Sequence, residues 1–259
     1  MNVNFSTPET LQAALLHVLD LADLSPAPPQ IGVIFFGGQG VTVLGDDQGI
    51  PTAAIGTLKQ ELVREWPAND GATPLDEAFA EAMRIISNLP KETRVTIVLM
   101  ADGVPSSGRL RPDDFPEVDA AIRELRLEIT QSNYPPAFQQ QLQSRLAQEL
   151  LDPKSETNVK LYTLQLKLEF ESTLNAATRL KERRVRFATV SFGNIPPLQV
   201  IHDTAGGAPD DLVVTTPDDV IAKLHQLNLL RMPRVVQLPT QDQASEPNRF
   251  ERSTTLPIE

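Results

Sequence analysis

Apolar residues recur every three or four positions in several stretches of the chain, which is the spacing of amphipathic helices. The pattern predicts helices over residues 8–24, 52–66, 74–88 and 218–229. Thr7 and Pro8 suit the start of the first helix, because threonine caps helix N-termini and proline favours their first position.

Short, continuous apolar runs lie between these stretches and are typical of buried strands. They cover residues 31–36, 94–101, 185–192 and 211–216. The first run, "IGVIFF", leads through "GGQG" into "VTVLG", which predicts a β-hairpin with glycines in its turn. Strands that alternate with helices in this way predict an α/β fold with a mainly parallel sheet.

Two regions fall outside a minimal α/β unit. Residues 104–158 form an insertion with two helical patterns joined by "SNYPP". Residues 164–171, "LQLKLEFE", alternate as an edge strand would, yet they also fit a helical face, so both alternatives stay open and the insertion can extend to residue 170. Residues 232–259 are rich in Pro, Gln, Ser and Thr without an apolar period, which predicts a disordered tail after a domain of residues 1–231.

The composition limits which partners, which chemistry and which cellular location we expect. The formal net charge is -11, so an acidic surface repels nucleic acid and anionic lipid. No cysteine is present, which excludes disulfides and thiolate chemistry. No apolar run reaches the ~18 residues of a membrane helix, and the N-terminus does not have the pattern of a secretory signal. We therefore expect a cytoplasmic protein.

Five stretches, taken in order, resemble the von Willebrand factor type A (vWA) domain family. They are "IGVIFFGGQGVTVLG", "GATPLDEAF", "VTIVLMADG", "VRFATVSFG" and "IHDTAGGAPDDLVVTTPDDVIAKL". The resemblance implies a doubly wound, Rossmann-like sheet flanked by helices, with ligands bound at the carboxyl ends of the strands.

The resemblance also implies a metal-ion-dependent adhesion site in three parts. Thr73 matches the threonine of that site and Asp102 its second acid, whereas the expected Asp-x-Ser-x-Ser loop is absent. By spacing, this loop falls near the N-terminus, with either Asn2, Asn4 and Ser6 or Asn4, Ser6 and Pro8 at its ligand positions.

The site is therefore degenerate, with Ser6, Thr73 and Asp102 as its metal candidates. Oxygen ligands of this kind suit Mg²⁺ or Mn²⁺, although the degenerate loop equally allows no metal at all. In the family a partner's carboxylate completes the metal's coordination, which makes the rim of Asn4, Ser6, Thr73 and Asp102 the candidate partner-binding surface.

A purely structural interpretation of these residues also stays open. Thr73 would cap a helix that starts at Pro74, and Asp102 would tighten the turn that follows its strand. "PDD" at residues 112–114 and 217–219 would open helices, and "RLKERR" at residues 179–184 would be a solvated helix end.

The remaining chemistry does not indicate an enzyme. His17 and His225 fall in helical patterns and suit packing or the surface, and His202 suits packing before the last strand. No nucleophile elbow, phosphate loop or zinc motif is present. We expect a non-enzymatic scaffold that binds a protein partner. The alternative is an α/β enzyme or nucleotide-binding protein that uses the "FFGGQG" loop, although no helix pattern follows that loop.

Overall fold

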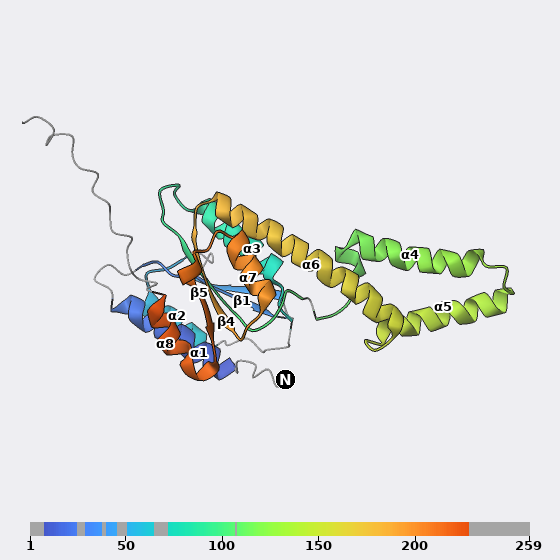
Figure 1. Ribbon diagram of the computed structural model, residues 1–259, viewed down its shortest axis with the longest axis horizontal. Coiled ribbons are helices and arrows are strands. Elements are labelled where there is room, and N and C mark those ends of the chain that lie inside the picture. The colour runs from blue at the N-terminus through green and yellow to red at the C-terminus, as the bar shows by residue number, and fades with distance from the viewer. Residues whose placement is uncertain are drawn as a thin grey trace, which may run out of the picture.

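The computed structural model describes residues 8–24, 29–37, 40–45, 51–64, 72–106 and 108–227. Helices and strands follow the order that the apolar pattern predicts (Figure 1). The α-helices are α1 (Pro8–Asp23), α2 (Ile55–Arg64), α3 (Leu75–Asn88), α4 (Pro116–Gln131), α5 (Pro136–Leu151), α6 (Glu156–Glu182), α7 (Pro196–Thr204) and α8 (Val220–Gln226). The strands are β1 (Val33–Gly37), β2 (Gly40–Leu44), β3 (Thr96–Ala101), β4 (Arg186–Phe192) and β5 (Leu212–Thr215).

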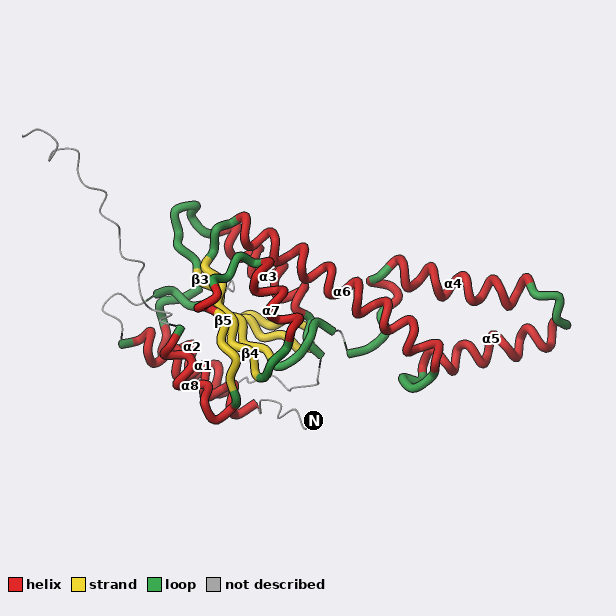
Figure 2. The backbone as a smooth tube through the Cα atoms, in the orientation of Figure 1, coloured by secondary structure: helices red, strands yellow, loops and turns green. Residues whose placement is uncertain are grey.

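A three-stranded parallel sheet lies at the centre of the fold, with the strand order β3-β4-β5 (Figure 2). Its central strand, β4, is buried on both faces, so it reads as a continuous apolar run. On one face, Phe187 packs with the apolar residues of α3, α6 and α7. On the other face, Val190 and Phe192 pack with α1 and α8. The predicted α/β fold, with a parallel sheet between helices, is confirmed.

The predicted hairpin forms a second sheet, in which β1 pairs antiparallel with β2. Gly40 has a φ of +99°, which confirms a glycine with positive φ at the turn. This hairpin packs with α1 and α2 in a cluster that includes Leu19, Val33 and Leu58. The described strands therefore make two sheets rather than the single one expected, since the hairpin is not hydrogen-bonded to β3, β4 or β5.

The insertion forms a helical arm, which we define as α4, α5 and the first half of α6. Figure 1 shows the arm projecting to one side of the sheet and its helices. Its interior is a separate apolar cluster around Val118, Ile122 and Leu161. Residues 164–171 belong to α6, so the strand alternative is wrong. The second half of α6 packs into the main core through Ala177 and Leu180, which makes α6 one continuous link between arm and core.

Several boundaries differ from the prediction by a few residues. Helix α2 begins at Ile55 rather than at residue 52, and α8 begins at Val220 after a short 3₁₀ turn, Pro217–Asp219. A similar turn, Pro112–Asp114, precedes α4, and a third "PDD", Pro209–Asp211, makes one before β5. The predicted tail lies outside the described residues. Within the described residues, no helix has the length and apolar character needed to cross a membrane.

Candidate functional site

Thr73 and the turn after Asp102 meet at the carboxyl end of β3. Strand β3 ends at Ala101, and Asp102 and Gly103 follow it directly. Thr73 pairs with Ser106 through two backbone hydrogen bonds, of 2.7 Å from the Thr73 amide and 3.0 Å from the Ser106 amide. A methyl group on Gly103 would lie 3.0 Å from Thr73 Oγ1, so the threonine hydroxyl rests against that glycine. The structure therefore brings together the segments that carry two of the predicted site residues.

Thr73 does not cap α3, so this structural interpretation is wrong. The helix begins at Leu75, with Pro74 at the cap position and no side-chain hydrogen bond there. The backbone of Thr73 is already used by Ser106, and its hydroxyl faces Gly103. Thr73 is 9% exposed, which leaves its oxygen in a tight space beside the strand end.

The third part of the predicted metal site falls on Asn4 and Ser6, which lie outside the described residues. Thr73 and Asp102 supply one hydroxyl and one carboxylate, a donor set that suits a hard cation such as Mg²⁺. Among the described residues no cluster of three or more His, Asp or Glu side chains could hold a metal. Metal binding by Thr73 and Asp102 therefore stays a prediction.

The loop that follows Asp102 is held by two polar side chains of α6, Gln165 and Tyr162, which the sequence analysis did not single out. Gln165 is fully buried, accepts a hydrogen bond from the Arg111 amide at 2.6 Å, and donates to the Arg109 carbonyl at 2.9 Å. It also donates to Glu169 at 2.7 Å, and Glu169 is only 2% exposed. We call residues 102–111 the neck, because this loop joins β3 to the arm.

Tyr162 contacts the same loop from one turn earlier on α6. It hydrogen-bonds the side chain of Ser106 and the backbone of Gly108. Burial, reinforced by the nearby Glu169 carboxylate, raises the pKa of the Tyr162 phenol above its ordinary value, although these hydrogen bonds act in the opposite direction. The phenol therefore keeps its proton to a higher pH than a solvent-exposed tyrosine does.

Arg111 fastens the far end of the neck to α3. Its guanidinium lies 3.1 Å from Glu77 on α3 and 3.4 Å from Asp114. Gly108 has a φ of +73° and lies so close to Ala72 that a methyl group there would approach within 3.1 Å. The neck is thus fixed to both α3 and α6, and the arm begins from a rigid base.

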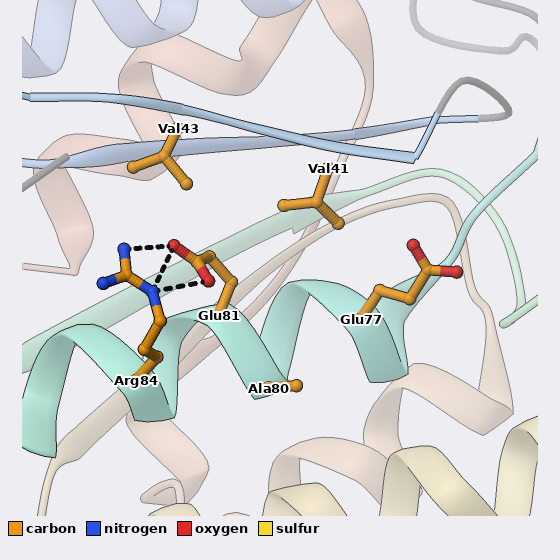
Figure 3. A pocket seen from close by; sticks show the side chains of 6 residues that line it. All are labelled: Val41, Val43, Glu77, Ala80, Glu81 and Arg84. Carbon is orange, nitrogen blue, oxygen red and sulfur yellow. Dashed lines mark hydrogen bonds and ion pairs between the residues drawn. The ribbon is translucent and has the colours of Figure 1, made fainter. Parts of the chain in front are cut away.

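A shallow, open hollow lies between β2 and α3 (Figure 3). Val41 and Val43 point into it from the hairpin. Across the hollow, Glu81 and Arg84 of α3 are bonded to each other at 2.6–2.9 Å. Because its charges already have partners, the hollow does not present a set of polar groups for a ligand.

His202 lies in the core, as expected. It is fully buried on α7, with Nδ1 3.0 Å from Thr189 Oγ1 and Nε2 2.9 Å from the Ala208 carbonyl. Since a carbonyl only accepts, Nε2 carries the proton and Nδ1 accepts from Thr189. A methyl group on Gly207 would lie 2.2 Å from this ring. His202 is therefore a packed and fully bonded residue.

Arg186, at the start of β4, forms a polar contact with the last part of the described chain. Arg186 forms two hydrogen bonds with Asp211 and donates a third to the Leu227 carbonyl at 2.7 Å. The bond to Asp211 raises the pKa of the Arg186 guanidinium further. This contact ties the start of β4 to the turn before β5 and to the residue that follows α8.

The "FFGGQG" loop closes the hairpin, and the chain continues from it into β2. Phosphate loops instead lead into a helix, whose N-terminal amides bind the anion. Gly38 and Gln39 themselves lie outside the described residues.

No protein-family model matches this chain, and no curated protein matches it in sequence. The resemblance to vWA domains therefore stays a prediction from the quoted residues.

Proposed function

We propose that this protein is a non-enzymatic interaction module of vWA type, a scaffold that binds a protein partner. The observation that carries the proposal is the helical arm, which projects away from the sheet and its helices (Figure 1). The neck that leads to it is bonded to α3 and α6. The neck begins at Asp102, so the arm and the rim of Thr73 and Asp102 lie at the two ends of one loop.

The end of the arm exposes aromatic and apolar side chains of the kind found in protein interfaces. Tyr134 and Phe138 are 52% and 43% exposed and form an edge-to-face pair with ring centroids 5.0 Å apart. Leu127, on the neighbouring helix α4, is 55% exposed. Exposed aromatic side chains are enriched where proteins bind each other. We propose that a partner covers this end of the arm, which we call the arm tip (Leu127, Tyr134 and Phe138).

The rim supports a second contact within the same proposal. Thr73 and Asp102 would hold Mg²⁺ or Mn²⁺ together with Asn4 and Ser6, and a carboxylate of the partner would complete the coordination. This part of the proposal rests on the resemblance of the sequence to vWA domains, since among the described strands the hairpin and the parallel sheet are separate sheets.

Capture of binding partners from the native cell extract tests the arm tip. The double variant Tyr134→Ser/Phe138→Ser removes the exposed aromatic pair. The matched control, Gln141→Ser/Gln148→Ser, changes two exposed polar residues of α5, the helix that carries Phe138. We expect the same proteins to be enriched by the wild type and the control and lost with the tip variant. Equal enrichment by all three proteins would exclude the arm tip as the contact.

Thermal unfolding with and without Mg²⁺ or Mn²⁺ tests the rim. A ligand that binds only the folded state raises Tm, by an amount that grows with the ratio of its concentration to Kd. We expect a rise for the wild type that disappears in Asp102→Ala. If neither protein responds, the rim does not bind metal, and partner binding rests on the arm alone.

A further inference from the structure

Two histidines from opposite ends of the described chain meet on the surface. His17 lies on α1 and His225 on α8, 208 positions later. Their Nε2 atoms are 3.0 Å apart, and the ring centroids lie 4.9 Å apart with the planes at 68°. The rings therefore point nitrogen to nitrogen, rather than stacking on each other.

Core packing fixes the two helices that carry the rings. Ala14 and Val18, which flank His17 on α1, pack in the same cluster as Val220 and Leu224 of α8. This cluster lies beneath the two helices, against Val190 of β4. This buried contact sets the spacing of the two helices, and the two imidazoles meet across it.

The geometry suits a transition-metal ion. Each Nε2 has one lone pair in the neutral tautomer that can accept a proton or a metal. In a tetrahedral zinc site with Zn–N of about 2.0–2.1 Å, two ligand nitrogens lie about 3.3 Å apart. The observed separation differs from this value by about 0.3 Å, which small side-chain rotations can provide.

We propose that His17 and His225 bind a divalent transition metal of the Zn²⁺, Ni²⁺ or Cu²⁺ class between α1 and α8. Imidazole prefers these ions, whereas Mg²⁺ and Mn²⁺ prefer oxygen ligands, so this site is distinct from the rim. His225 is exposed and His17 half-buried, so water can fill the remaining coordination positions. The bound ion joins the first and last described helices and stabilises the folded state.

Nuclear magnetic resonance of the histidine rings tests the site directly, because the chain contains three histidines. With untagged protein at about pH 7.5, above the ordinary histidine pKa of about 6.5, paramagnetic Ni²⁺ is titrated in. We expect the ring signals of His17 and His225 to broaden together and saturate at submillimolar Ni²⁺. His202 is the internal control and should be unaffected. Broadening of all three rings, or of none, would overturn the proposal.

Thermal unfolding with Zn²⁺ gives a second measurement. At a Zn²⁺ concentration about 100 times Kd, we expect Tm to rise by about 5–10 °C for a chain of this size. His17→Gln and His225→Gln should each abolish this rise, whereas Asp102→Ala should retain it. A rise that survives in either histidine variant would mean that Zn²⁺ binds elsewhere, and it would refute the assignment independently of the rim.

Discussion

Replacing Gln165 with methionine is the most direct test of the neck. Methionine has a similar volume and keeps the helix, but it cannot make the hydrogen bonds of the amide. The substitution removes the acceptor of the Arg111 amide, the donor to the Arg109 carbonyl and the donor to Glu169. The arm and core clusters themselves lose no apolar contact.

The expected cost follows from these bonds. The two bonds to the backbone are half-buried, and losing each costs about 1 kcal/mol. The third leaves the buried Glu169 carboxylate without one of its donors, which costs about 1–3 kcal/mol. The total, about 3–5 kcal/mol, is a large part of the ~5–15 kcal/mol stability of a typical domain.

Urea unfolding measures the global cost, and amide hydrogen exchange at Arg111 reports the neck itself. Lys167→Met is the matched control, because it introduces the same residue at an exposed position two residues along α6, where it removes only a long surface ion pair. We expect the control to change stability by less than about 0.5 kcal/mol. A cost below about 1 kcal/mol for Gln165→Met, with Arg111 exchange unchanged, would refute the claim that this amide fixes the neck.

Three further predictions concern single contacts. Because the pKa of Tyr162 is raised in the folded state, the unfolded state loses the phenolic proton at a lower pH than the folded state does. Its contribution to stability is therefore complete below about pH 10 and lost as pH rises above that value. Tyr162→Phe should remove this loss of stability, as measured by urea unfolding below and above pH 10. Gly207→Ala should lower the free energy of unfolding by about 2–4 kcal/mol, because the new methyl meets the packed His202 ring. Gly56→Ala, which meets no atom within 4 Å, should not destabilise the protein in the same urea assay. Asp211→Asn should cost about 1–3 kcal/mol by weakening the pair with its arginine, and an unchanged urea midpoint would contradict this.

The order of elements was predictable from the sequence because apolar periodicity reports burial directly. The parallel strands and the two arm helices appear within a few residues of their predicted positions. Strand pairing was not predictable in the same way, since the pattern of β1 does not show whether its neighbour is β2 alone or also a strand of the other sheet. Residues 164–171 stayed ambiguous because the buried stripe of α6 includes Gln165 and Glu169, which an apolar pattern does not count.

The candidate site was predictable only in part. The resemblance pointed to Thr73 and Asp102, and the structure brings Thr73 against the residue after Asp102. One feature of the sequence could have indicated the buried polar residues of α6. Gln165, Glu169 and Thr173 are four positions apart, so they lie on one side of the helix. The pairing of His17 with His225 has no local signal, because it arises only when the first and last helices pack together.

The packing of α1 has a consequence for how the chain reaches its native state during synthesis. The side of α1 that includes Ala14 packs with Val213, Val220 and Leu224, which are translated about 200 residues later. At about 5–20 residues per second, the ribosome needs about 10–40 s to supply them. During this interval the apolar side of α1 does not yet have the residues that it packs against in the folded protein. It is then a candidate substrate for chaperones, and it can be exchanged between two chains that emerge from the same polysome.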